Sequence, residues 1–437
     1  MKYLLFIVLM IFPGFIRAQV IISSERPKLT LNQPAISELL KSICSNIDKY
    51  YLYPVVAQKM IADLNNKFDK GAFNDVTNPV DFAQTITKEI RETSHDLHMN
   101  VVFDPMMAHE LIAMGKEPDQ TRKPPPDILS GRRQNYGFAK TEILQGNVGY
   151  LKLNQFADVQ YGSETAVAAM NFLSNADALI IDVRANGGGD GAMVNLLCSY
   201  LLNPTLHINS SYFRDTTKNE ESWTAAYVPG KRLTTIPVYV LTSTRTFSAA
   251  EEFAYDLQTT KRATIIGETT GGGAHHNQFV PIDSNFAMSV SIGEAINPIT
   301  HKNWEGTGVI PDVAIPQDKA LEVAQIEAMK NIRESAVDEQ QKRSLDWAID
   351  ELNAEANPVT PNESTLKKYA GVYGERTITF ENGSLYYQRK GKAKYKMIPM
   401  TENLFMFHEL EYFRLRFTTD DSGNVKLSGM YDNGMID

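Results

Sequence analysis

The chain has 437 residues, of which 43% are hydrophobic and 22% charged, and its formal net charge is −9. This length allows two to four domains that each bury a core, and the composition is that of a globular rather than a disordered protein. The excess of acidic over basic residues, 52 against 43, argues against nucleic acid as a partner, because nucleic-acid binders usually carry a basic stripe.

Residues 1–18 predict an export signal. Lys2 supplies the positive start, residues 3–12 form an apolar stretch, and Ala18 is a small residue at the cleavage edge. This stretch is too short for a comfortable transmembrane helix, although an uncleaved anchor is the alternative. We therefore expect a mature chain that begins near Gln19, is periplasmic or extracellular, and has no stable membrane span.

A helical N-terminal domain is expected over residues 19–116. Apolar residues recur there at three-to-four spacing, and a short strand is expected after His98. Residues 117–134 are rich in proline and charge, which predicts a linker or covering loop. The two cysteines, Cys44 and Cys198, lie on separate apolar helical stretches, which favours unpaired thiols and leaves one disulfide open.

Residues 135–318 predict an α/β core. Apolar strand-like runs alternate here with helical spacing, and the run ADALIIDVR is typical of a strand that is buried on both faces. Such alternation indicates βα units with a parallel sheet, whose sites form at the carboxyl ends of the strands. Residues 319–358 then predict a helical connector and linker, and residues 359–437 an antiparallel β domain with turn signals such as Asn382-Gly383.

Ser248 follows a predicted buried strand and opens a predicted helix. With Glu251 three residues later it forms a capping-box pattern, which by itself explains a serine at this place. The same place also suits a nucleophile, because the free N–H groups at a helix start stabilise a developing oxyanion. The two interpretations stay open on this motif alone.

A glycine-rich loop, DVRANGGGDGA, follows the buried strand that ends near Asp182. Gly187, Gly189 and Ala192 fit a loose dinucleotide pattern, with Asp215 near the place of a ribose-binding acid. Alternatively, the loop donates an oxyanion-hole N–H opposite the serine, or it is a tight turn without a further role.

Two histidine positions stand out among the eight. His98 lies where a predicted helix gives way to a strand, a common place for a functional side chain. His275 and His276 follow a second glycine run, where a metal site would need further ligands that the sequence does not identify.

Four motifs in fixed order, DVRANGGG, TFSAAEEFA, IIGETTGGGAHH and WEGTGVIPDV, resemble the core of a serine peptidase family. The family includes the C-terminal processing peptidases, the tricorn protease and the interphotoreceptor retinoid-binding protein. The resemblance covers roughly residues 33–316 and implies a processing-peptidase or crotonase-like α/β core. Processing peptidases use a lysine on the nucleophile's helix as base, but Lys261 lies too far along to face the serine, so the chain resembles the tricorn-like branch.

Carried over residue by residue, the resemblance implies Ser248 as nucleophile, His98 as general base and Glu305 as the acid that orients the base. It implies the backbone N–H groups of Gly188 and Ala249 as the oxyanion hole. No metal or organic cofactor is implied.

The chain departs from the family pattern in two places. Leu97 stands where the tricorn-like site has a serine, so that hydroxyl is missing or comes from elsewhere, such as Ser94. The interval from His98 to Tyr136 is too short for the PDZ domain that processing peptidases insert there.

These observations together predict an exported serine-type endopeptidase or oligopeptidase that acts on peptides or proteins. The alternative is a non-catalytic binding protein for an apolar small ligand on the same fold. The joint presence of Ser248, His98 and Glu305 favours the enzyme. A nicotinamide-dependent enzyme rests only on the loose glycine pattern and is the least favoured.

Overall fold

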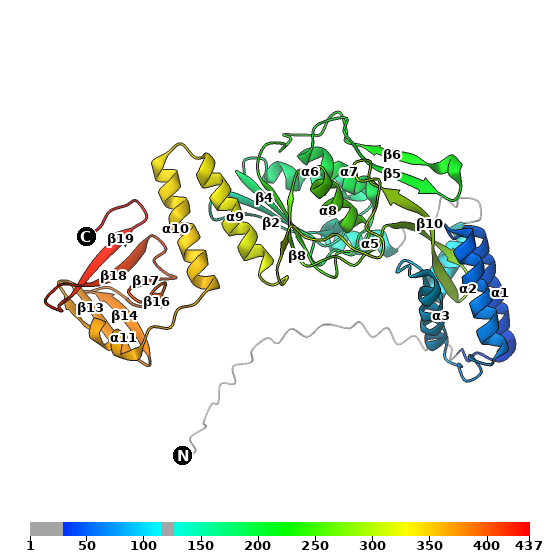
Figure 1. Cartoon of the computed structure of the whole chain (residues 1–437), viewed down its shortest axis with the longest axis horizontal. Helices are drawn as coiled ribbons and strands as arrows, with labels where there is room; N and C mark the ends of the chain where they lie inside the picture. The colour runs from blue at the N-terminus through cyan, green and yellow to red at the C-terminus, as the bar shows by residue number, and fades with distance from the viewer. Residues whose placement is uncertain (1–28, 115–125) are drawn as a thin grey trace, which may run out of the picture.

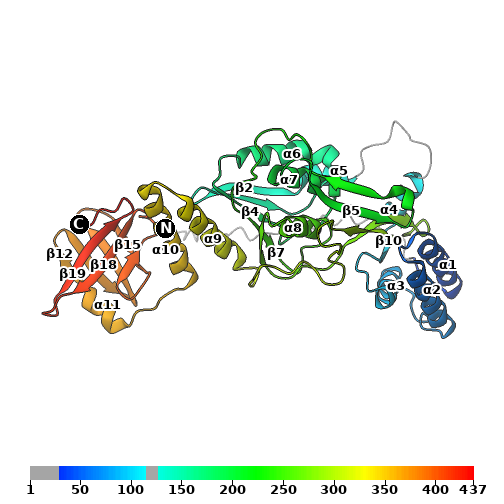
Figure 2. The ribbon, with the colours of Figure 1, turned by 45° about the horizontal axis from the view of Figure 1, so that its top comes forward.

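A computed structural model describes residues 29–114 and 126–437 of the chain, so the predicted export signal lies outside the described residues. Figure 1 shows a helical bundle at one end, an α/β core in the middle and a β domain with the C-terminus at the other end. The turned view in Figure 2 keeps this order. Within the described residues, no helix combines the length and apolarity needed to cross a membrane.

The helical bundle is formed by α1 (Gln33–Tyr50), α2 (Pro54–Asp69) and α3 (Pro79–Ser94). Asparagine side chains cap the first and third helices, each followed closely by a proline that suits a first helical turn. The predicted strand after His98 is β1 (Asn100–Phe103), and α4 (Pro105–Met114) follows it.

The core is built on a six-stranded sheet in the order β11-β8-β7-β4-β3-β2. Its strands are β2 (Phe138–Leu144), β3 (Val148–Leu153), β4 (Ala178–Asp182), β7 (Val238–Thr242), β8 (Thr264–Gly267) and β11 (Val313–Ala314). All neighbours are parallel except β2 and β3. The predicted α/β fold class is confirmed.

Helices cover both faces of this sheet, because alternate residues of each buried strand point to opposite sides. One hydrophobic core lies under α6 (Val159–Phe172), α7 (Gly191–Leu201) and α8 (Ala249–Thr259). The other lies under α9 (Ala320–Ser335) and α10 (Glu339–Ala356). The chain passes from the carboxyl end of β7 through a short turn into α8, so this turn lies at the carboxyl edge of the sheet.

A second, antiparallel sheet was not predicted from the sequence. It contains β1, β5 (His207–Phe213), β6 (Glu220–Trp223), β9 (His275–Pro281) and the long β10 (Phe286–Ile296). β10 pairs with β1 through its first half and with β5 through its second half. Because apolar residues of β9 and β10 complete the core of the helical bundle, this sheet joins the bundle to the α/β core.

The predicted linker at 117–134 differs in part from the structure. Residues 115–125 lie outside the described residues, and Pro126–Arg133 form helix α5, followed by the short helix η1 (Asn135–Gly137). The proline at the first position of α5 is compatible with a helix start, whereas the proline and charge content of this stretch had suggested a loop.

The β domain follows α11 (Glu363–Tyr369) and contains two antiparallel four-stranded sheets with a shared apolar core. The strands are β12 (Gly371–Tyr373), β13 (Arg376–Glu381), β14 (Ser384–Arg389), β15 (Lys394–Lys396), β16 (Ile398–Pro399), β17 (Leu404–Met406), β18 (Phe413–Thr419) and β19 (Val425–Tyr431). Elsewhere, Cys44 and Cys198 are both unpaired, as favoured from the sequence.

Candidate active site

Ser248 lies in a strained turn between β7 and α8. Its φ of 54° and ψ of −125° are rare for a residue other than glycine, and such strain persists only where the surroundings impose it. Here the Thr246 hydroxyl donates to the carbonyl of Val183 at 2.9 Å, and the N–H of Phe247 donates to the carbonyl of Asn186 at 3.1 Å. The turn is therefore tied to the loop that follows β4.

The carboxylate of Glu251 anchors this turn to the second glycine loop, residues 269–274, which precedes β9. It is fully buried and accepts the backbone N–H groups of Ser248, Gly272 and Gly273 at 2.7–2.8 Å, as well as the hydroxyl of Thr270. Both contacts of the capping box are thus present, although the contact between the Ser248 side chain and the Glu251 N–H lacks the geometry of a hydrogen bond. Ser248 is only half-buried, which leaves its hydroxyl available for chemistry.

The first glycine loop packs directly against the serine turn. A Cβ on Gly188 would stand 2.8 Å from the Ser248 Cβ and 3.0 Å from the Ala249 nitrogen. However, the N–H of Gly188, expected in the oxyanion hole, already donates to the side chain of Asn186 at 2.9 Å. The N–H groups of Gly189 and Ala249 carry no hydrogen bond within the described residues, and both residues line a pocket beside Ser248.

His98 lies close to the serine turn but is not hydrogen bonded to Ser248. Its ring contacts the ring of Phe247, with 4.7 Å between the centroids, and Gly273 approaches it from the second glycine loop. Both ring nitrogens are buried without a hydrogen-bond partner. Burial lowers the pKa of His98 to about 4, so the imidazole is neutral near pH 7.

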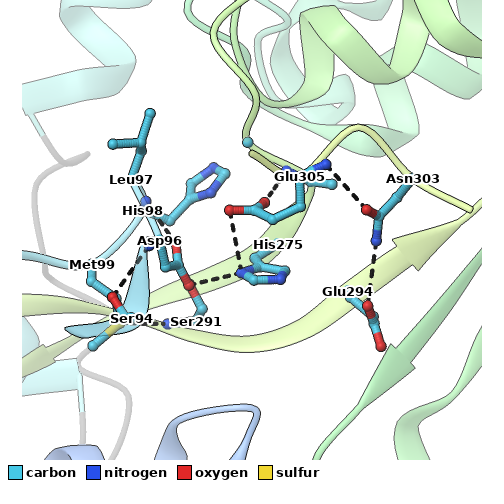
Figure 3. Close-up of polar contacts among 12 residues, drawn as sticks. Ser94, Asp96, Leu97, His98, Met99, His275, Ser291, Glu294, Asn303 and Glu305 are labelled. Atoms are coloured by element: carbon cyan, nitrogen blue, oxygen red, sulfur yellow. Dashed lines mark hydrogen bonds and ion pairs between the residues drawn. The ribbon is translucent and has the colours of Figure 1, made fainter. Parts of the chain in front are cut away.

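Asp96 and His275, which are both buried, form a cluster with the half-buried Glu305 beside this histidine (Figure 3). Asp96 Oδ2 accepts a hydrogen bond from His275 Nδ1 at 2.7 Å, and Asp96 Oδ1 accepts the backbone N–H of His98 at 2.9 Å. Glu305 Oε1 lies 3.7 Å from His275 Nδ1, and its Oε2 accepts the N–H of Ala274 at 2.5 Å. The Glu305 carboxylate therefore lies beside the imidazole of His275, and no hydrogen bond joins it to His98.

The cluster shifts the pKa values of its members. Burial alone would lower the pKa of His275, but the hydrogen bond and charge of Asp96, together with Glu305, raise it above the ordinary value. Burial would raise the pKa of Asp96, yet the hydrogen bond and charge of His275 lower it. Burial, partly offset by His275, raises the pKa of Glu305 to about 7. The Asp96–His275 pair is therefore charged in mildly acidic solution.

Among the described residues, these three side chains also form a group that could hold a metal ion, because their ligand atoms all lie within 4.8 Å of one another. The 2.7 Å contact between Asp96 and His275 has the length of a charge-assisted hydrogen bond, and that bond uses the His275 Nδ1. The hydrogen-bonded pair accounts for the geometry without an ion.

A pocket of about 140 Å³ opens beside Ser248. Its wall includes Gly189, Ala249, His275 and Trp304. The indole N–H of Trp304 donates to the carbonyl of Gly273 at 2.8 Å, which fixes the second glycine loop at the back of the pocket. The site thus combines an accessible hydroxyl, two unused N–H groups and an oriented imidazole in one concave place.

The structure brings Ser248, Ala249 and Gly188 into contact, places His98 against the neighbouring Phe247, and places Glu305 on His275. The hydroxyl of Ser94 accepts the N–H of Asp96 at 3.2 Å, so it does not replace the serine expected before His98, and Leu97 is exposed.

Three residues that contribute to the site were missed or given another role in the sequence analysis. Asp96 stands two residues before His98, and that short spacing was the available signal. His275 was noted, but its carboxylate partners lie far away in the chain. Glu251 was assigned only to a helix cap, whereas it also holds the second glycine loop.

Residues 147–315 match the model of peptidase family S41. The carboxyl-terminal-processing protease of Picosynechococcus is 28% identical over 173 residues, which are 39% of this chain and 40% of the relative. The carboxyl-terminal-processing peptidase 2, chloroplastic, of Arabidopsis thaliana is 27% identical over 175 residues, or 39% of this chain and 32% of the relative. The chain therefore spans well under half the length of the relatives it matches.

Among solved structures, the photosystem II D1 C-terminal processing protease aligns with 64% of this chain and 94% of its own, at 16% identity and a TM-score of 0.42. The tricorn protease aligns with 73% of this chain and 37% of its own, at 13% identity and a TM-score of 0.40. The matched segment 147–315 holds Ser248, both glycine loops and Glu305, while Asp96 and His98 precede it. The resemblance indicated by the sequence motifs is thus confirmed for the α/β core, which matches peptidase family S41.

Proposed function

We propose that this protein is an exported serine-type endopeptidase or oligopeptidase with Ser248 as its nucleophile. The observation that carries the proposal is the strained turn at Ser248, which presents the hydroxyl at the start of α8 beside the unused N–H groups of Ala249 and Gly189. A serine that serves only as a helix cap needs neither the strain nor the pocket.

The reaction proceeds by acyl transfer. The Ser248 oxygen attacks the carbonyl carbon of the peptide bond while His98, neutral near pH 7, takes its proton. The N–H groups of Ala249 and Gly189 receive the oxyanion, and each such donor contributes about 10²–10³-fold in rate. The protonated imidazole then gives its proton to the leaving amine, and water hydrolyses the acyl-enzyme by the same route.

His98 must come within about 2.6–3.2 Å of the Ser248 hydroxyl for this transfer, a contact that often tightens only when substrate binds. His275 is the second candidate for the base, since Asp96 holds its Nδ1 and the residue lines the same pocket as Ser248. An acid that orients the imidazole in this way is the arrangement found in Ser-His-Asp triads.

A fluorophosphonate probe tests the nucleophile. We expect labelling of the wild-type protein at Ser248, identified by peptide mass, and none in Ser248→Ala. Ser163→Ala, a serine on α6 away from the pocket, is the matched control and should label like wild type. An unlabelled, correctly folded wild-type protein would refute the peptidase and favour the binding protein for an apolar small ligand.

The substrates are peptides or proteins, and the site acts without a metal or organic cofactor. Hydrolysis of fluorogenic peptides should survive treatment with a chelator. Loss of hydrolysis on chelation, with recovery on addition of zinc, would instead assign Asp96, His275 and Glu305 to a metal site.

Export follows from the predicted signal at residues 1–18. The mass of the intact protein from the exported fraction should correspond to a chain that begins at or near Gln19. A full-length mass in that fraction would contradict cleavage.

A further inference from the structure

A second, larger cleft of about 620 Å³ adjoins the pocket at Ser248. The two cavities share Gly191, Glu252 and His276 in their walls. The hairpin of β5 and β6, which projects from the core in Figure 1, supplies the outer wall. A substrate chain that places a carbonyl at Ser248 therefore has this cleft directly beside it.

The cleft is acidic and contains no compensating cation. Its lining includes Asp190, Glu220, Glu221 and Glu252, and no lysine or arginine stands among the described residues that line it. Burial raises the pKa of Glu252 to about 7, so a cation bound beside it would favour its charged form.

Glu252 is the group that points to a ligand. The residue is 9% exposed, and its Oε1 accepts the side-chain amide of Asn209 at 2.8 Å. No hydrogen bond within the described residues engages Oε2, which stands 3.9 Å from where a Cβ on Gly191 would lie. A glycine at that place keeps the approach to this oxygen open, and Oε2 remains available to accept a hydrogen bond from a ligand in the cleft.

The remaining acids divide into one structural and two rim groups. Asp190 is occupied, since its two oxygens accept the N–H groups of Val159 and Ala192 at 2.9 Å. Glu220 and Glu221 are exposed on the hairpin, and Glu221 accepts the indole N–H of Trp223 at 3.0 Å. One face of the Trp223 ring stacks on His207, and the exposed remainder of the ring suits the methylene stem of a long side chain with a charged end.

We propose that this cleft binds the basic side chain, lysine or arginine, of a substrate residue that flanks the peptide bond attacked by Ser248. This inference rests on the proposed peptidase function and adds its substrate class. The ammonium or guanidinium group donates to Glu252 Oε2 at the inner end, the stem lies along Trp223, and the rim glutamates attract the cation. Glu252 is four residues after Ser248, at the start of the same helix, so specificity and attack are positioned together.

The test is hydrolysis of fluorogenic peptides that are identical except at the two residues flanking the scissile bond. Each flanking position carries in turn lysine, arginine, norleucine, glutamine or glutamate. At one of the two flanking positions, we expect peptides with lysine or arginine to have a kcat/KM at least about tenfold higher than the peptide with norleucine. A single charge-assisted hydrogen bond is strong enough to give a ratio of this size. In Glu252→Gln this ratio should fall by about tenfold. In Glu164→Gln, an exposed acid on α6 outside both cavities, it should stay unchanged.

A rim variant keeps the test valid if Glu252→Gln does not fold. Combined Glu220→Gln and Glu221→Gln changes lie at exposed positions, and they should lower the same ratio about threefold by removing two nearby charges. Peptide hydrolysis without preference for a basic residue, or a preference unchanged in these variants, overturns the inference alone. No hydrolysis together with no labelling of Ser248 overturns the peptidase proposal, and the inference with it.

Discussion

Asp96 and His275 are 179 residues apart in the chain, and their side chains meet in a buried hydrogen bond of 2.7 Å. The raised pKa of His275 stabilises the fold below about pH 6.5, and this contribution is lost as the pH rises through the folded-state value. The lowered pKa of Asp96 stabilises it above about pH 3.8, and this contribution is lost as the pH falls through its folded-state value. The ion pair therefore contributes most between these limits.

Asp96→Asn should cost about 3 kcal/mol of unfolding free energy at pH 5.5, because it leaves a buried charged imidazole without its partner. At pH 9 the cost should be clearly smaller, because the imidazole loses its charge as the pH rises through its raised pKa. Urea titrations at the two pH values measure the difference. Glu38→Gln, an exposed acid on α1, is the control and should show almost no change at either pH. Equal costs at both pH values for Asp96→Asn would contradict a charged pair.

The identity of the base predicts the pH profile of kcat/KM. With His98 as base, activity should persist at pH 5 and be lost only as the pH falls through about 4, where the ring takes up a proton. With His275 as base, the acidic limb should lie above pH 6.5, because its pKa is raised. The single variants His98→Ala and His275→Ala identify which imidazole the limb reports, since the variant of the base should lose about 10²–10⁴-fold in rate.

Gly188→Ala should disturb the serine turn. The residue has φ +106°, and the added Cβ would stand 2.8 Å from the Ser248 Cβ and 2.9 Å from the carbonyl oxygen of Phe247. We expect a loss of about 1–3 kcal/mol in stability and about 10²-fold slower probe labelling. Gly187→Ala is the matched control, because nothing lies within 4 Å of its Cβ position. Similar labelling rates in both variants would show that the contact is unimportant.

Glu251→Gln should loosen the connection between the serine turn and the second glycine loop. The amide removes the charge and one acceptor that together serve three backbone N–H groups and a hydroxyl. A buried donor left without an acceptor costs about 1–3 kcal/mol. Thermal unfolding should show a lower Tm, and labelling of Ser248 should slow. An unchanged Tm with normal labelling would mean that the glutamine amide replaces the carboxylate fully.

A chain that ends at residue 358 should still react with the probe. The matched motifs and Ser248 lie within residues 147–315, and the β domain has its own apolar core. Its removal uncovers Trp347 on α10, whose indole N–H donates to the backbone carbonyl of Glu411 at 2.8 Å and whose ring contacts Arg414. We therefore expect a lower Tm with labelling retained. A folded truncated chain without labelling would assign the β domain a part in the site.

The sequence predicted correctly those elements whose signal lies within one continuous segment. The buried strand before Ser248, the helix after it and the two glycine loops are continuous segments with clear periodicity, and the structure has them as predicted. The antiparallel sheet was missed because β9, β10 and β5 recognise each other only through distant pairing. The partners of His275 were missed for the same reason, since Asp96 and Glu305 come from segments on either side of it in the chain.

The strand β10 belongs to two hydrophobic cores at once. Phe286, Met288 and Val290 pack with the helical bundle, while Ala295 packs with the α/β core. The segment with Asp96 and His98 follows the last helix of the bundle, so His98 and Ser248 are held by two bodies that share one strand. A helical bundle from another relative therefore cannot be exchanged by a simple N-terminal fusion. The exchanged part would also have to include β9 and β10. The segments that form this site therefore alternate along the chain between the bundle and the α/β core, and they would have to be transferred together.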